Sequence, residues 1–317
     1  MENLALKIDT NKFFRYQKQF SISFLKIIIL IIIMLILILD ILIYIKLLHI
    51  NSRIGKKITF EYENLQKSNL SFKEFKLYKN LCPKTINGKH KILVGKYGDG
   101  SYALFDDFNN IRIAYSFGIS NKSSFDEDLA NRGINVYMYD HTINKIYSND
   151  TRLHWQKVGI TSEKNVKHNL KSLRKLLKEN GHINEKNMIL KMDIEHNEWE
   201  VLDEISPEVL NKFKYLILEF HFRKPENYKL YANVLEKLNR NHQPFHIHCS
   251  NCGTSFFQIG DNPICRGLEV SFIIKKGNQF INDLSDYPIK GFDFLTCPYK
   301  PFIKNELNIL KFCNYNN

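Results

Sequence analysis

The segment that decides the fold runs from Ile111 to Asp140 and reads IRIAYSFGISNKSSFDEDLANRGINVYMYD. Its pattern predicts a strand, a loop, a helix and a second strand. The apolar run before Gly118 is typical of a strand that is buried on both faces of a parallel sheet. The run VYMY before Asp140 predicts the second strand. We therefore expect the loop and the terminal carboxylate to lie at the carboxyl edge of a sheet.

The helix between these strands is predicted to start at Ser124 and to end near Arg132. Ser124 is followed three residues later by Glu127, the spacing of a capping box that satisfies free backbone N–H groups. Gly133 is a common residue directly after a helix, because glycine adopts the left-handed conformation easily. These signals predict one short helix over residues 124–132.

Two features of this unit suit a ligand at the edge of the sheet. Gly118 allows a close backbone approach, and the N-terminus of the following helix favours a polar or charged group. Asp140 lies about twenty residues further on, where an acidic residue commonly binds both hydroxyls of a ribose. A tight βα turn followed by a solvated aspartate explains the same pattern without a ligand, so this unit alone leaves both interpretations open.

The chain after Asp140 keeps alternating strand and helix patterns, which predicts one doubly wound α/β sheet. The expected strands are 111–117, 136–139, 153–160, 188–192, 214–222, 245–249 and 268–275. The expected helices are 124–132, 165–180 and 225–240. Residues 91–106 alternate apolar residues on both sides of Asp99-Gly100, which predicts a β-hairpin. The hairpin is either purely structural, or Asp99 and Tyr102 border a ligand pocket.

Acidic side chains follow two of the later strands. Asp193 and Glu195 come directly after one predicted strand, and Glu219 and His221 end the next one. If these strands neighbour the first strand, the carboxylates lie beside Gly118 at one edge of the sheet. Carboxylates are rarely buried without a partner or a function. The sequence therefore predicts a binding or catalytic site at this edge.

The N-terminal part contains a candidate membrane anchor. Residues 27–39 are thirteen consecutive apolar residues, and with 41–45 beyond Asp40 the stretch is nineteen residues long. That length is close to the ~20 residues that span a bilayer. A cleaved signal peptide would have a shorter apolar region and small residues at its end. We expect a single-pass anchor over 20–50, with an orientation that the evenly divided flanking charges leave open.

The net charge of +12 is spread along the chain. Dispersed lysines usually form a solvated face, although an anionic membrane surface or an acidic substrate could use them. The chain lacks a basic-aromatic nucleic-acid motif, so a nucleic-acid partner is not expected.

The six cysteines leave two interpretations open. They permit disulfides if the domain is exported, although the spacing of a small disulfide-rich domain is not evident. Alternatively, a zinc site could form near the end of the strand at 245–249, but its second ligand pair is incomplete. The residues of that alternative are Cys249, Cys252, Cys265, His246 and His248.

Taken in order, these segments resemble an S-adenosylmethionine-dependent methyltransferase of the seven-stranded class. More narrowly, they resemble the membrane-anchored methyltransferase-like family (METTL-type, methyltransferase domain 22) and its FkbM-type relatives. The matching segments are DGSY at 99–102, YSFGI at 115–119, SFDEDLA at 124–130, YD at 139–140, LKMDIEHNEWEVL at 190–202, LEFHF at 218–222 and LEVSFI at 268–273. They cover about residues 82–275, and the single N-terminal anchor is also similar.

The resemblance implies a Rossmann-like, doubly wound, seven-stranded methyltransferase domain at 82–280 that binds S-adenosylmethionine. The rest of the chain then divides into an N-terminal tail (1–19), the anchor (20–50), a helical stalk (51–81) and a C-terminal tail (281–317). The implied cofactor-binding residues are Ser116, Phe117, Gly118, Ile119, Ser120, Asp140 and Gly159. The implied catalytic residues are Asp193, Glu195, Glu219 and His221. The sequence departs from the family pattern in its reduced glycine loop and at His196, where the family has glycine.

The implied reaction is in-line methyl transfer from a sulfonium to an acceptor oxygen near a membrane, and positioning supplies much of its acceleration. The acceptor, whether glycan, lipid, protein or small molecule, is not written in the sequence. Asp193 with Glu195 could instead hold a divalent cation, which is not the favoured interpretation. Two rival functions stay open. One is a membrane-anchored glycosyltransferase that uses the Asp193-Ile-Glu195 triplet, and the other is a non-catalytic domain of the same fold.

Overall fold

The structure is a computed structural model, and it describes residues 39, 42, 46, 72–120, 122–252, 256–259, 262–300 and 306–313. Internal contacts divide the chain into two units, Met1–Asn64 and Leu65–Asn317. The description below concerns the second unit. The expected tail at 1–19, nearly all of the expected anchor at 20–50 and most of the expected stalk lie outside the described residues. Within the described ranges, none of the helices combines the length and the apolar character needed to cross a bilayer.

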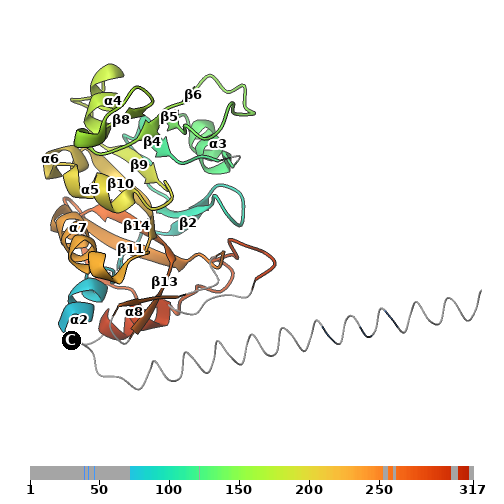
Figure 1. The fold of residues 1–317 in the computed structure, drawn as a ribbon, viewed down its shortest axis with the longest axis vertical. Helices are drawn as coiled ribbons and strands as arrows, with labels where there is room; N and C mark the ends of the chain where they lie inside the picture. Colours follow the sequence, from blue (N-terminus) through green and yellow to red (C-terminus); the bar gives the residue numbers. More distant parts are fainter. Residues whose placement is uncertain are drawn as a thin grey trace, which may run out of the picture. The chain divides into compact units, whose positions relative to one another are not determined.

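A seven-stranded sheet forms the centre of this unit (Figure 1). Its strands are β4 (Ile113–Phe117), β5 (Asn135–Tyr139), β6 (Leu153–Gln156), β9 (Met188–Met192), β10 (Phe213–His221), β11 (His242–Cys249) and β14 (Gly267–Ile274). Their order is β11-β14-β10-β9-β4-β5-β6. The strands from β10 to β6 pair in parallel, and β14 runs antiparallel to both β10 and β11. The prediction of one seven-stranded α/β sheet is confirmed.

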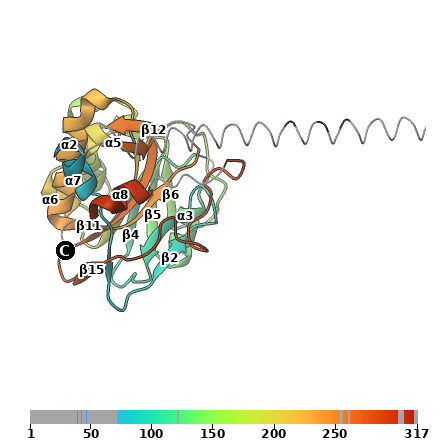
Figure 2. The same ribbon diagram turned by 90° about the horizontal axis from the view of Figure 1, so that it is seen from below.

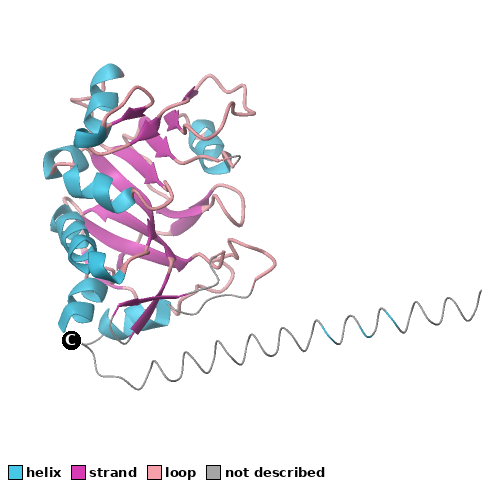
Figure 3. Cartoon of the chain, in the orientation of Figure 1, coloured by secondary structure: helices cyan, strands magenta, loops and turns pink. Residues whose placement is uncertain are grey.

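Helices and a hairpin cover the two faces of this sheet, as Figure 3 shows. One face carries α4 (Leu173–Glu179), α5 (Glu198–Glu204), α6 (Pro207–Leu210) and α7 (Tyr228–Asn241). The other face carries α3 (Ser124–Asn131) and the hairpin of β2 (Lys91–Val94) and β3 (Tyr102–Phe105). Figure 2 shows α6 and α7 on one side and α3 and β2 on the other. Each face has its own cluster of buried apolar side chains, which explains why the central strands are apolar throughout.

Two terminal helices pack onto the same core. They are α2 (Phe72–Lys79) and α8 (Glu306–Cys313). The ring of Tyr78 stacks on that of Phe312 with a centroid distance of 4.6 Å, and both side chains belong to the main core. These helices lie within 51–81 and 281–317, the ranges that the sequence pattern placed outside the methyltransferase domain.

The remaining elements are short. They are β1 (Lys84–Ile86) paired with β15 (Phe280–Asn282), β7 (Gly159–Ile160) with β8 (Leu170–Lys171), β12 (Phe256–Ile259) with β13 (Asn262–Cys265), and the 3₁₀ turns η1 (Glu163–Asn165) and η2 (Pro225–Asn227).

The chain between β6 and β9 differs from the expectation. The expected strand 153–160 ends as β6 at Gln156, and Gly159–Ile160 pair with β8 outside the main sheet. The expected helix 165–180 begins only at Leu173, because Ser172 caps it by accepting a hydrogen bond from the backbone N–H of Lys175. The preceding residues form η1 and β8 instead.

The predicted start of the helix at Ser124 and the predicted turn of the hairpin also differ from the structure. The capping box at Ser124 is absent: Ser123 is the N-cap, and the Ser124 hydroxyl accepts a hydrogen bond from the backbone of Lys96, 3.1 Å away. The predicted hairpin at 91–106 is confirmed, with Val94 paired to Tyr102. Its connection is the longer loop 95–101, not a tight turn at Asp99-Gly100.

All six cysteines form disulfides. The pairs are Cys82–Cys313, Cys249–Cys265 and Cys252–Cys297. The zinc alternative is therefore wrong, because its three cysteines are each oxidised and bonded to another sulfur. His246 serves a different purpose, since its Nε2 lies 2.9 Å from Oδ1 of the buried Asp293.

Candidate active site

A cavity of about 360 Å³ lies where β4, β9 and β10 end at the carboxyl edge of the sheet. Its walls also include the β2–β3 loop with Asp99, Tyr102 at the start of β3, and the segments that hold Cys252 and Thr296. The predicted site residues that line it are Gly118, Ile119, Ser120, Asp193, Glu195, Glu219 and His221. The structure thus brings all four predicted catalytic residues together with the glycine loop.

Four predicted cofactor residues lie outside this lining. Ser116 and Phe117 are buried within β4, where their side chains belong to the interior. Gly159 packs on the residue after Asp140, since a Cβ on this glycine would lie 2.6 Å from Nδ1 of His141. Asp140 is buried beneath the glycine loop, 5% exposed.

Gly118 is a glycine because the end of β9 passes directly over it. Its φ is +76°, and a Cβ there would lie 1.5 Å from the backbone oxygen of Asp193. The backbone N–H of Asp193 also donates to the carbonyl of Phe117, 3.1 Å away. The close backbone approach predicted at Gly118 is therefore made by the neighbouring strand, and it places the Asp193 side chain beside the loop.

Asp140 holds the glycine loop in place. Its Oδ2 accepts hydrogen bonds from the backbone N–H groups of Ile119 and Ser120, at 2.9 and 2.8 Å. Its Oδ1 accepts from the backbone N–H and the hydroxyl of Thr142, at 2.8 and 2.6 Å. Burial alone would raise the pKa of Asp140, but these hydrogen bonds lower it below the ordinary value. A carboxylate has about four acceptor positions, so a ribose hydroxyl can bond here only by replacing one of these donors.

His221 is oriented by a buried carboxylate. Its Nδ1 lies 2.9 Å from Oε1 of Glu198, which is fully buried at the start of α5. The same Oε1 accepts hydrogen bonds from the backbone N–H groups of Ile194 and His196. Burial alone would lower the pKa of His221, but the hydrogen bond to Glu198 and the negative charge of Glu219 outweigh it and raise the pKa to about 9. The ring therefore presents Nε2 to the cavity.

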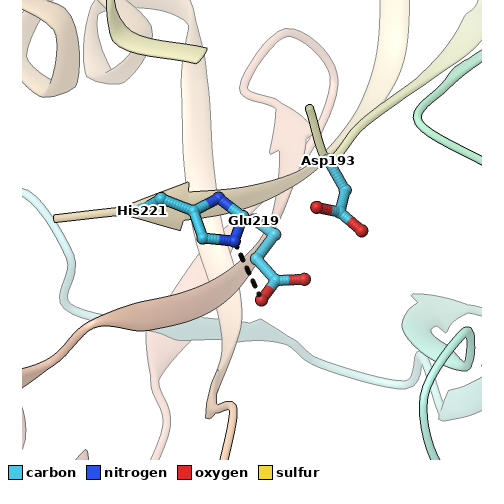
Figure 4. A group of neighbouring side chains, drawn as sticks. All are labelled: Asp193, Glu219 and His221. Carbon is cyan, nitrogen blue, oxygen red and sulfur yellow. Dashed lines mark ion pairs between the residues drawn. The ribbon is translucent and has the colours of Figure 1, made fainter. Parts of the chain in front are cut away.

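The side chains of Asp193, Glu219 and His221 converge, as Figure 4 shows. One ligand-type atom from each lies within 4.8 Å of the other two. Nε2 of His221 is 3.6 Å from Oε1 of Glu219. Burial, and next the charge of Asp193, raise the pKa of Glu219 well above its ordinary value. Two carboxyl groups and an imidazole therefore share one small region.

Glu269 adds a further carboxyl group. It is directly opposite Glu219 in the antiparallel β10–β14 pair, so both side chains leave the same face of the sheet. Burial and the charge of Asp193 raise the pKa of Glu269 as well. The site is therefore more acidic than the sequence alone suggested.

Lys191 supplies a buried cation to the same region. It lies on β9 and is 6% exposed. Its Nζ donates to the carbonyl oxygens of Phe117 and Gly118 and lies 3.7 Å from Oδ2 of Asp193. Lys191 therefore joins the ends of β4 and β9 and itself lines the cavity.

Sequence reasoning missed Glu198, Glu269 and Lys191. The lysine was visible as a charge inside the apolar run MILKM. Glu198 was visible only as another acidic residue in DIEHNE, and Glu269 depends on a strand pairing that no local pattern indicates.

Residues 96–253 match a family model described as "Methyltransferase FkbM domain". The chain is therefore related to the FkbM methyltransferases. Methyltransferases of this family generally use S-adenosylmethionine. A comparison with curated proteins found no match to this chain. The FkbM match includes the glycine loop, β9, β10 and α5, while β14 with Glu269 lies beyond it.

The turn after β9 explains one departure from the family pattern. His196 stands where the resemblance in the sequence predicts glycine, and its φ is +89°. The preceding Glu195 also has a positive φ, +53°. Glycine adopts this region without strain, whereas other residues hold it only when their surroundings require it. Here the hydrogen bond from the backbone of His196 to Glu198 helps to hold the turn.

Proposed function

We propose that the chain is an S-adenosylmethionine-dependent methyltransferase that methylates a hydroxyl group of its acceptor. One observation carries most of the weight: the Gly118 loop and the acidic ends of β9 and β10 line the same cavity. Ligands of open α/β sheets bind at the carboxyl ends of the strands, which suits a cofactor beside an acceptor. The match to the FkbM domain supports the same activity.

The residues around Gly118 fit the methionine end of the cofactor. Gly118 has no side chain, and it borders the cavity together with Ile119 and Ser120. The cavity volume of about 360 Å³ falls within the roughly 300–1,000 Å³ typical of small-molecule sites. When bound, S-adenosylmethionine supplies a methyl group whose carbon–sulfur electron pair stays on sulfur as the acceptor oxygen forms the new bond. Gly118, Ile119 and Ser120 would hold it, with Asp140 fixing their loop.

Asp193, Glu219 and His221 are the residues that act on the acceptor hydroxyl. A hydroxyl loses its proton as its oxygen gains the methyl group, and the proton needs a path to solvent. Glu219 suits this role, because its side chain lines the cavity and converges with Asp193 and His221. In the site without an ion, His221 has its pKa raised to about 9, so it is protonated near neutral pH and donates a hydrogen bond.

The glycosyltransferase alternative has less support. It needs Asp193 and Glu195 to bind one metal ion together. The side chain of Glu195 is 77% exposed, and the carboxylate that converges with Asp193 is Glu219. A non-catalytic role has no specific observation in its favour, because buried carboxyl groups facing a cavity are costly without a function.

The disulfides support a location for this activity. Proteins keep structural disulfides in oxidising compartments, and this chain has three with no free cysteine. We place the catalytic domain on the exported side of a membrane, with residues 20–50 as the anchor. In this orientation the domain acts on glycans, lipids, proteins or small molecules at or beyond the membrane surface.

A ligand-protection experiment tests the proposed function. S-adenosylhomocysteine should raise the melting temperature of the purified full-length chain, because a ligand that binds only the folded state stabilises it. A nucleoside diphosphate with Mn²⁺, measured against Mn²⁺ alone, is the comparison arm. Protection by the nucleotide and not by S-adenosylhomocysteine would favour the glycosyltransferase and contradict methyl transfer.

A further inference from the structure

The group formed by Asp193, Glu219 and His221 offers two carboxylate oxygens and an imidazole nitrogen to one point. Asp193 directly follows β9, and Glu219 and His221 lie at the end of the adjacent parallel strand β10. The three atoms lie within 4.8 Å of one another. That spacing places each atom within reach of one central ion. The cavity borders all three side chains, which leaves room for further ligands such as water or an acceptor oxygen.

Glu219 is an unusual carboxylate because its oxygens accept no hydrogen bond from the described residues. Its side chain is 10% exposed, and the nearest cationic atom is Nε2 of His221 at 3.6 Å. Gly267 makes this position available, since a Cβ there would lie 2.9 Å from Oε1 of Glu219. A buried carboxylate that faces a cavity without a donor is costly unless something in the cavity binds it.

His221 is held as a metal-ligating histidine usually is. Such a histidine donates its other ring N–H to a carboxylate, which fixes the ring and the tautomer. Here Nδ1 lies 2.9 Å from Oε1 of Glu198, and two backbone N–H groups fix that carboxylate in turn. Nε2 faces the cavity and lies 3.5 Å from Oε2 of the exposed Glu195 and 3.6 Å from Oε1 of Glu219.

From this geometry we propose that Asp193, Glu219 and His221 bind a divalent metal ion, with Glu198 as the positioning residue behind His221. Two oxygens and one imidazole suit Mn²⁺ or Zn²⁺ among the common ions. The ion's role in catalysis rests on the proposed function and would replace the direct role of Glu219 as proton acceptor: the acceptor oxygen would take an open coordination position, its pKa would fall and its proton would leave to solvent. The oxygen then forms the bond to the methyl carbon, while the carbon–sulfur electron pair stays on sulfur.

Further acidic residues lie near Glu219, while cations lie elsewhere in the lining. Glu269 faces the group from β14, directly opposite Glu219, and Asp99 lines the same cavity from the β2–β3 loop. Three cations also line the cavity: Arg266, Lys191, and Lys122, which pairs with Asp99. Lys191 lies 3.7 Å from Asp193, but its Nζ also donates to the carbonyl oxygens at the end of β4. Oε2 of Glu195 lies 3.5 Å from Nε2 of His221, but its side chain is 77% exposed. Glu195 is not among the three residues whose ligand atoms lie within 4.8 Å of one another, so this ligand set differs from the Asp193-x-Glu195 triplet.

Metal titration of the full-length chain tests the proposal without an acceptor. A chelator first removes bound metal from the protein. The metal-free protein is then titrated by calorimetry with MnCl₂ and, in a second series, with ZnCl₂. Electron paramagnetic resonance follows the Mn²⁺ titration as well. We expect one site per chain. Asp193→Asn, Glu219→Gln and His221→Gln should each weaken binding at least tenfold.

Glu198 provides a matched pair of variants on one helix. Glu198→Gln should weaken metal binding roughly 10–100-fold, the range seen when a carboxylate behind a metal-ligating histidine is changed. Glu200→Gln, an exposed carboxylate two residues further along α5, should leave it within twofold. Melting temperatures of the metal-free variants separate loss of the site from loss of the fold.

Three outcomes would overturn the metal site. One is the absence of saturable Mn²⁺ or Zn²⁺ binding at millimolar concentration. Another is metal binding whose affinity Glu219→Gln and His221→Gln leave unchanged. The third is metal binding that Glu195→Gln weakens and Glu219→Gln does not. S-adenosylhomocysteine binding is measured on the same metal-free samples. Cofactor binding without metal binding overturns only the metal site, while metal binding without cofactor binding supports the site and contradicts the proposed function.

Discussion

Nδ1 of His221 lies 2.9 Å from Oε1 of Glu198, and this carboxylate is fully buried. The contact links the end of β10 to the start of α5, the helix that follows the strand carrying Asp193. It fixes the imidazole at the edge of the cavity, with Nε2 near the carboxyl groups of Glu195 and Glu219. The acidic groups at two strand ends therefore depend on a third carboxylate that does not itself line the cavity.

We expect Glu198→Gln to lower the pKa of His221 by at least one unit in metal-free protein. The neutral amide removes the charge that helps to raise this pKa to about 9. Histidine resonances followed by NMR against pH measure the midpoint. Glu200→Gln is the control on the same helix, and an unchanged midpoint in Glu198→Gln would contradict the assignment.

The same pair predicts a pH dependence of stability. The folded-state pKa of His221 is about 9 and lies above the unfolded-state value of about 6.5. The contribution of protonated His221 to the free energy of unfolding is therefore complete below about pH 6.5 and is lost as the pH rises through about 9. The difference of the two pKa values sets an upper limit of about 3 kcal/mol. Urea unfolding at pH 6 and pH 9.5 should show a smaller loss in His221→Gln than in wild type. Equal losses would exclude His221 as the source.

Gly118→Ala should strongly destabilise the fold. A Cβ at this position would lie 1.5 Å from the backbone oxygen of Asp193, so β4 and β9 would have to separate. We expect a loss of about 3 kcal/mol or more in the free energy of unfolding. Gly133→Ala is the matched control, since its φ is also positive but nothing lies within 4 Å, and it should cost only about 1–2 kcal/mol. Urea unfolding of both variants makes the comparison, and equal losses would contradict the steric reason.

Removal of the Cys252–Cys297 disulfide should loosen one wall of the cavity. Cys252 lines the cavity, and Asn251 accepts a hydrogen bond from the backbone of Cys297 beside it. In Cys252→Ser/Cys297→Ser we expect faster amide exchange around residues 250–252 and 295–300. The Cys82–Cys313 pair joins the chain next to α2 to the end of α8, so its double serine variant should affect those helices instead. Identical exchange patterns in the two variants would contradict a local role.

The disulfides also predict the redox state of the natural protein. Maleimide added to the denatured, unreduced chain should label none of the six cysteines, and all six should react after reduction. Labelling before reduction would place the domain in a reducing compartment and contradict export.

Much of the sheet could be predicted because runs of consecutive apolar residues indicate buried strands. The run before Gly118 and the run MILKM both became central strands, as expected for strands covered on two faces. The acidic residues after them were found by the same reasoning, since the end of a buried strand must reach the sheet edge. The helix before Gly181 was predicted too long, because its N-cap at Ser172 gives only a weak local signal.

The missed parts depend on contacts between distant residues. Glu269 faces Glu219 only because β14 enters the sheet between β10 and β11. Cys82 and Cys313 are 231 residues apart, and spacing gives no means of pairing them. The burial of Glu198 follows from the turn at Glu195 and His196, whose positive φ values are not typical of these residue types.

Calorimetric titration of the full-length chain with S-adenosylhomocysteine tests the central claim most directly. We expect one saturable site per chain, and Asp140→Ala should weaken it by ~1–3 kcal/mol because the loop at Ile119 and Ser120 loses its buried acceptor. Wild-type protein that is folded and yet releases no heat at millimolar S-adenosylhomocysteine would contradict a methyltransferase site in this cavity.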